Sequence, residues 1–340
     1  MVNIARTGAI AATLTLALAA GCTDASSADD ATVDLRLGLI YAPEVPAVEC
    51  GAQPLAEDPE LKRLGLNVLI YPSAQLGGEN EMVQQVSTGQ LEATIGTASI
   101  LANDFNFPEL TFLEAYYLTD SIEQAFTVHR SKIATELFEQ LPERANLQRV
   151  GDPWLYGPRH VFGVRPVRQL SDFDGLKFRV PQVDVSIKGA EALGANPTPT
   201  AYSELYLAMQ QGIVDAGEAP ASVIAAESFD EAASYVSLTR HQISASPMVV
   251  NSDWWQELSS EQQAGLRSAT NAAARAVAEC ARVADAKAIA DWRAGDAVRV
   301  VDDVRRDELA TRAREYFSHG FPFSEAYRQA RQLLERGAGQ

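Results

Sequence analysis

A stretch near the C-terminus, residues 260–294, most constrains how this chain can fold. It is rich in alanine, contains no proline, and is interrupted by a single glycine, Gly265. Ser259 or Ser260 can cap its start, and Ser259 with Gln262 has the spacing of a capping box. At ~1.5 Å per residue, a helix over this stretch is ~50 Å long, which is longer than a small domain. We therefore expect a helix that spans two domains or lies along one face of both.

The remaining sequence alternates between short strand patterns and short helix patterns, separated by glycine and proline. The predicted strands are 33–41, 66–71, 91–95, 146–150, 160–164, 176–180, 213–216, 248–251 and 298–301. The predicted helices besides the long one are 79–87, 122–141, 186–193, 203–211, 306–318 and 325–335. This alternation of strands and helices indicates an α/β protein with partly parallel sheets.

The N-terminus has the features of an export signal. Arg6 precedes an apolar run, 9–20, which is too short to cross a bilayer as a stable helix but has the length of a signal core. Small residues then lead to Cys22, as in a lipobox, although Ala19 stands where leucine is usual. We predict a lipoprotein signal peptide over 1–22 with acylated Cys22, and a flexible tether over 23–32. A plain cleaved signal is the alternative. The expected location is the periplasm or cell surface, with the lipid as the sole membrane anchor.

The formal net charge of −17 limits the possible partners. An acidic body repels phosphate backbones, so no nucleic acid partner is expected. Any anion site must be a local basic pocket within this acidic field. The chain has no P-loop and no dinucleotide fingerprint, and its four histidines lack metal-ligand spacing, so no cofactor and no metal are predicted.

Two cysteines remain once Cys22 is assigned to the lipid, namely Cys50 and Cys280. In an exported protein this pair indicates one disulfide, which would close a very long loop. Two separate free thiols are the alternative.

Several long motifs occur in order along the chain and carry a family resemblance. They are DGLKFRVP at 174–181, EALGANPTP at 191–199, AYSELYLAMQQGIVD at 201–215 and YPSAQLGGE at 71–79. With this order and spacing, residues 33–330 resemble the solute receptors of tripartite ATP-independent periplasmic (TRAP) transporters.

The resemblance implies a two-lobed periplasmic-binding-protein-like fold. Two mixed β-sheets flanked by helices would be joined by hinge strands, and the long helix would span both lobes. The first lobe would comprise 33–155 and 244–284, and the second 156–243 and 285–335. A small organic acid ligand would bind in the cleft between the lobes, and TRAP membrane permease subunits would receive it from the closed form.

The resemblance also assigns Arg179 to a two-pronged salt bridge with the ligand carboxylate. A guanidinium presents paired N–H donors that match the two oxygens of a carboxylate. At the C-terminal end of a strand, beside Pro181, it would point into the crevice outside the sheet. The alternative is a structural arginine paired with a residue such as Asp174. Arg159 matches a second arginine of the family, with a structural role in the cleft wall as its alternative.

Four further positions match ligand-contacting positions of the family, namely Gln182, Tyr202, Glu218 and Thr97. Core packing at a helix N-terminus is the alternative for Tyr202. Trp154 is a fifth candidate, which could stack on the ligand or pack in the hinge. Ala219 replaces the family asparagine that follows the glutamate, and the positions near Ile40 and Tyr41 are apolar or aromatic. These changes predict a ligand less polar than a polyhydroxylated sugar acid.

Two other functions remain open at this point. The same fold could feed a signalling sensor, or the chain could be an exported hydrolase or isomerase using Glu218 or Asp215. No Gly-x-Ser-x-Gly elbow is present, and no histidine lies by motif beside a nucleophile. We therefore expect a binding receptor and no enzyme.

Overall fold

The computed structural model describes residues 32–337, which form one compact unit. The predicted signal segment, Cys22 and most of the predicted tether lie outside these residues. Among the residues described, no helix is both long enough and apolar enough to cross a membrane.

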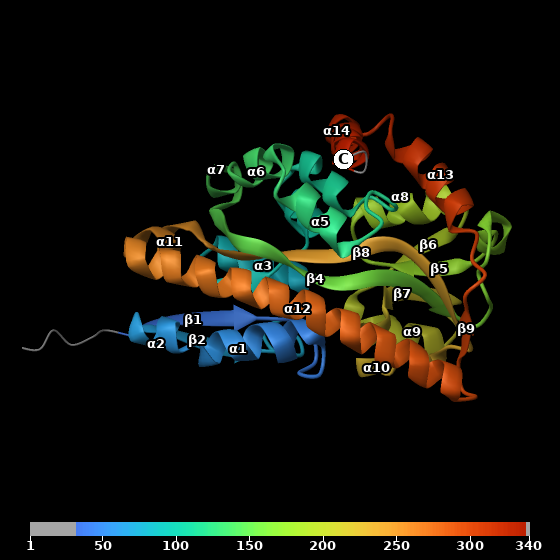
Figure 1. The fold of residues 1–340 in the computed structure, drawn as a ribbon, viewed down its shortest axis with the longest axis horizontal. Coiled ribbons are helices and arrows are strands. Elements are labelled where there is room, and N and C mark those ends of the chain that lie inside the picture. Colours follow the sequence, from blue (N-terminus) through green and yellow to red (C-terminus); the bar gives the residue numbers. More distant parts are fainter. Residues whose placement is uncertain (1–31, 338–340) are drawn as a thin grey trace, which may run out of the picture. The chain divides into compact units, whose positions relative to one another are not determined.

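A nine-stranded mixed sheet organises the unit (Figure 1). Its strands are β1 (Val33–Gly38), β2 (Leu66–Tyr71), β3 (Ala93–Ile95), β4 (Leu147–Gly163), β5 (Lys177–Val180), β6 (Asn196–Pro199), β7 (Ala216–Pro220), β8 (Tyr235–Asn251) and β9 (Arg299–Val301). The order is β2-β1-β3-β8-β4-β7-β5-β6, and β9 pairs with β8.

The two long antiparallel strands β4 and β8 join the two parallel ends of this sheet. At one end β1 pairs in parallel with β2 and β3, and at the other β5 pairs in parallel with β6 and β7. The mixed α/β architecture is as predicted, but the two expected sheets are hydrogen-bonded into one. The reason is that β4 and β8 are 17 residues each and run through both halves, with register shifts where the pairing bends.

Helices cover both faces of the sheet. They are α1 (Gln53–Glu57), α2 (Pro59–Arg63), α3 (Glu79–Ser87), α4 (Ala98–Asp104), α5 (Ile122–His129), α6 (Lys132–Phe138), α7 (Leu141–Ala145), α8 (Asp184–Leu193), α9 (Leu205–Gln210), α10 (Ala221–Ala226), α11 (Ser252–Glu257), α12 (Ser260–Ala294), α13 (Arg306–Phe317) and α14 (Ser324–Gly337). Short irregular helices are η1 (Val48–Ala52), η2 (Pro108–Glu114), η3 (Leu170–Phe173), η4 (Tyr202–Glu204) and η5 (Phe229–Ala232). The single helix predicted for 122–141 is two short ones, α5 and α6, and α7 begins at its last residue. Helix α6 begins where Ser131 Oγ accepts from Ala134 N.

The long helix α12 has the bounds that its composition predicts. Ser259 and Gln262 form the expected capping box, with Gln262 N donating to Ser259 Oγ at 3.2 Å. The helix packs against α1, α2, α10 and β9 (Figure 1). It also packs against η1, around Val277 and Cys280 near its middle. A disulfide between Cys50 and Cys280 fastens it to η1, which confirms the predicted pairing.

The C-terminal helices reach both halves of the sheet. Helix α13 packs against α8, whereas α14 packs against α5, α6 and η2. The predicted second lobe includes 285–335, but α14 lies on elements predicted for the first lobe, and Arg314 donates from α13 to the carbonyl of Tyr117. An apolar face on α14 needs a partner surface, and the α5–α6 region provides it.

Candidate functional site

A cavity of about 670 Å³ lies where the parallel strands of both sheet halves end. Residues at or just after the ends of β1, β3, β5 and β7 line it, including Tyr41, Thr97, Gln182 and Pro220. Carboxyl ends of parallel strands are the usual place for a ligand in an α/β sheet, because loops and side chains converge there. The volume is that of a small-molecule site.

Strand β5 delivers Arg179 to this cavity. Alternation along the strand turns Phe178 and Val180 to the core and Arg179 to the other face, and Pro181 ends the strand. The guanidinium is 2% exposed, and its Nε and Nη2 donate to the carbonyl of Thr200 at 3.0 and 2.7 Å. Among the described residues it has no carboxylate partner, so the edge formed by its other N–H groups is open to a ligand.

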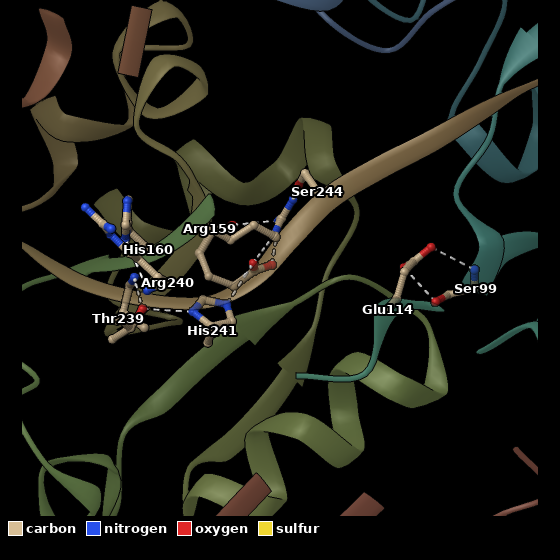
Figure 2. A network of polar contacts seen from close by, with 10 residues as sticks. Ser99, Glu114, Arg159, His160, Thr239, Arg240, His241 and Ser244 are labelled. Atoms are coloured by element: carbon tan, nitrogen blue, oxygen red, sulfur yellow. Dashed lines mark hydrogen bonds and ion pairs between the residues drawn. The ribbon is translucent and has the colours of Figure 1, made fainter. Parts of the chain in front are cut away.

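Arg159 enters the same cavity from β4, but its donors are occupied. Its Nη1 donates to Ser244 Oγ at 2.7 Å, and its Nη2 donates to Glu218 Oε1 at 2.7 Å (Figure 2). Its Nε also donates to the Glu218 carboxylate. Gly157 precedes this position with φ +98°, and an added Cβ would lie 2.4 Å from Asp285 Oδ2, so only glycine fits the bend before Arg159.

Glu218 lies behind Arg159 and does not line the cavity. Burial alone would raise its pKa, but the charge of Arg159 and a hydrogen bond with His241 lower that pKa to about 2. His241 Nε2 lies 3.3 Å from Glu218 Oε2, and its Nδ1 lies 2.8 Å from Thr239 Oγ1 (Figure 2). Burial lowers the pKa of His241, which favours its neutral form. The glutamate therefore holds Arg159 in place and balances its charge.

An aromatic series forms one wall of the cavity. Tyr41 packs edge-on against Tyr156 and Tyr202, with ring centroids 5.4 and 5.6 Å apart. The hydroxyls of Tyr156 and Tyr202 are buried and make no hydrogen bond to any described residue. They can give a ligand polar contacts while their rings exclude water.

Trp154 corrects one of the sequence-based predictions. It is 0% exposed, lies outside the cavity lining, and belongs to the hydrophobic core, where its ring lies against Gly51. The packing alternative therefore holds for Trp154. Of the other predicted residues, five line the cavity: Arg179, Arg159, Tyr202, Gln182 and Thr97.

The carboxylates that line the cavity were not predicted as site residues. Glu79 at the start of α3 accepts from Thr97 N at 2.6 Å. Glu114 at the end of η2 accepts from Ser99 N at 3.0 Å and from Ser99 Oγ at 2.6 Å (Figure 2). Glu227 accepts from Ala42 N at 3.1 Å. Glu114 carried a usable signal, because it is the only charged residue in the apolar segment 110–118. These side chains make the lining more polar than expected.

Comparison with known proteins places the chain in a family. Residues 60–319 match the family model "Bacterial extracellular solute-binding protein, family 7". The sialic acid-binding periplasmic protein of Vibrio cholerae is 28% identical over 237 residues, which are 69% of this chain and 72% of that protein.

Two solved structures extend the similarity over nearly all of the chain. A TRAP periplasmic solute-binding protein from Ochrobacterium anthropi with bound L-fuconate has a TM-score of 0.82 and 27% identity, covering 89% of this chain and 100% of that one. One from Actinobacillus succinogenes with bound L-galactonate has a TM-score of 0.81 and 26% identity, with coverage of 89% and 100%. This chain therefore belongs to bacterial extracellular solute-binding protein family 7, the substrate-binding receptors of TRAP transporters.

Proposed function

We propose that this chain is a receptor that binds a small organic carboxylate through Arg179 and releases it unchanged to TRAP membrane permease subunits. The observation that carries the proposal is the state of Arg179. Its guanidinium is buried in the cavity wall, oriented by the Thr200 carbonyl, and without a carboxylate partner among the described residues. A carboxylate is the group that best complements such an edge, since two charge-assisted hydrogen bonds form at once.

The two carboxylates considered for catalysis from the sequence, Glu218 and Asp215, are poorly suited to proton transfer in the cavity. Glu218 is held ionised by Arg159, so it is a poor proton donor or acceptor near neutral pH. Asp215 accepts from Lys177 N and does not line the cavity. Incubation of the protein with a bound acid, followed by mass analysis, should return the acid unchanged, and turnover would contradict the receptor proposal.

Lobe closure and membrane attachment complete the proposed function. Tyr41 and Tyr202 come from the two predicted lobes and pack edge-on against each other at the cavity. A ligand that contacts both rings would therefore favour the closed form. Acylated Cys22 would keep the exported receptor close to its permease. Metabolic labelling with a fatty acid, compared with Cys22→Ser, tests the anchor.

A thermal-shift panel tests the binding proposal. It should pair small acids with neutral counterparts of the same skeleton, such as L-galactonate with galactitol, because relatives of this fold bind sugar acids. We expect stabilisation by one or more acids and none by their neutral partners. Equal stabilisation by an acid and its neutral counterpart would contradict the proposal.

A further inference from the structure

Within residues 32–337, the unpaired positive charge at the cavity comes from a single side chain. Arg159 is neutralised by Glu218, as described above, which leaves Arg179 as the guanidinium available to an anionic group. A ligand that brings one carboxylate would balance this charge completely. Any further charged group in the cavity lining then needs a partner of its own.

Four carboxylates line the same cavity and form no ion pair with any residue the structure describes. They are Glu79, Glu114, Glu227 and the exposed Glu81. Their hydrogen bonds come from backbone N–H groups and one hydroxyl, which fix the position of each carboxylate but bring no full positive charge. Placing several carboxylates at a partly buried surface without a cation is costly.

The pKa values of two of these groups agree with a missing cation. Burial and, to a smaller extent, the nearby Glu114 raise the pKa of Glu79 to about 7. Burial also raises the pKa of Glu114, although Ser99 and Arg159 act in the opposite direction. A positive group placed between these carboxylates would favour their ionised form and be attracted in return.

We infer that the natural ligand carries a cationic nitrogen in addition to its carboxylate, with the carboxylate on Arg179 and the nitrogen near Glu79 and Glu114. This inference rests on the proposed function and names the class of its ligand as a zwitterion. An ammonium offers three N–H donors, and carboxylates accept without donating, so the two are complementary. A ligand with hydroxyls alone would supply donors to this wall but no compensating charge.

Calorimetric titrations with matched pairs of ligands test the inference. Suitable pairs are 4-aminobutyrate with 4-hydroxybutyrate, 5-aminovalerate with 5-hydroxyvalerate, and D-glucosaminate with D-gluconate. We expect the amino member of at least one pair to bind at least about tenfold more tightly than its hydroxy partner, which corresponds to about 1.4 kcal/mol. A panel in which no amino member binds, or in which each hydroxy member binds as well as its amino partner, overturns the inference.

Two variants locate the cationic group. Glu114→Gln keeps an oxygen that accepts from Ser99 N, and its amide NH2 can donate to Ser99 Oγ. Glu79→Gln keeps the oxygen that accepts from Thr97 N. Each variant therefore removes charge with little change in shape. We expect each to weaken an amino ligand about tenfold and its hydroxy partner less than threefold. Glu44→Gln, at an exposed position outside the cavity lining, is the matched charge control and should change neither. Equal weakening of both partners in both variants contradicts the inference.

The same titrations separate this inference from the proposed function. If hydroxy acids bind and require Arg179, the receptor proposal stands and the zwitterion assignment falls. If an amine that lacks the carboxylate binds as well as the amino acid does, the carboxylate receptor proposal itself falls.

Discussion

The two arginines of the cavity differ in what surrounds them. Arg159 on β4 is held by Glu218 and Ser244, with His241 supporting the glutamate from behind. Arg179 on β5 is held by one backbone carbonyl, that of Thr200, which orients it without cancelling its charge. The protein thus pairs the charge of Arg159 itself and leaves the charge of Arg179 for the ligand. A buried charge is tolerated when it is paired. Removing Arg179 should therefore weaken ligand binding, whereas removing the partner of Arg159 should lower the stability of the protein.

The largest expected effect comes from removing the open arginine. Arg179→Ala should weaken carboxylate binding by about 3–5 kcal/mol, or roughly 100- to several-thousand-fold, because a charge-assisted contact in a dry cavity is lost. Its effect on stability should be small, since no buried carboxylate is left unpaired. Calorimetry and chemical denaturation measure the two effects.

Arg165→Ala is the matched control for this experiment. Arg165 is exposed and donates to the Asp174 carbonyl outside the cavity, so affinity should not change. If Arg179→Ala binds the acid with nearly wild-type affinity, Arg179 is not the group that binds the carboxylate.

Removing the partner of the closed arginine should act on stability instead. Glu218→Ala leaves the buried Arg159 without its counter-ion and should lower the free energy of unfolding by about 3–5 kcal/mol. Urea denaturation of the unliganded protein measures this loss. A variant as stable as the wild type would mean that the pair does not compensate the charge of Arg159.

Lowering the pH should produce the same loss of stability gradually. The pKa of Glu218 is about 2 in the folded protein, below its ordinary value of 4.5. The stability it contributes is therefore fully present above pH 4.5 and is lost as the pH falls towards 2, on the order of 3 kcal/mol in total. The difference in unfolding free energy between wild type and Glu218→Gln should shrink between pH 5 and pH 3. A constant difference would argue against an ionised Glu218.

The smallest effect is expected at Ser244. Ser244→Ala removes one hydrogen bond to the Arg159 guanidinium and should cost about 1 kcal/mol of stability, because water in the cavity can replace the hydroxyl. Its thermal unfolding should stay far closer to the wild type than that of Glu218→Ala. Equal losses in both variants would show that the ion pair is no stronger than a single neutral contact.

The sequence predicted those parts of the fold whose signals are local. Residues 260–294, 79–87 and 66–71 have the predicted bounds, because capping residues, glycines and prolines mark their ends. The length of β4 and β8 was missed because Gly157, Pro158 and a series of buried polar residues interrupt the strand pattern. Cross-strand pairing with register shifts, which is a tertiary effect, carries both strands through these interruptions.

The candidate site was predictable where a motif fixes a residue at a strand end. Arg179 and Gln182 follow this rule and line the cavity. Trp154 was misplaced because an aromatic residue beside the cavity wall and one in the core have the same sequence pattern. Glu79 was missed because nothing local shows that the start of α3 lines the cavity. Glu114 was missed because a lone charge in an apolar segment signals burial but does not show which cavity the side chain lines.

The central claim is that a carboxylate on the ligand meets Arg179. The most direct measurement is the affinity of the wild-type protein for the acid that stabilises it most, compared with the primary amide of that acid. The amide keeps the size and one oxygen but loses the charge and one acceptor, so we expect binding at least about 100-fold weaker. An amide that binds as tightly as the acid would contradict the claim.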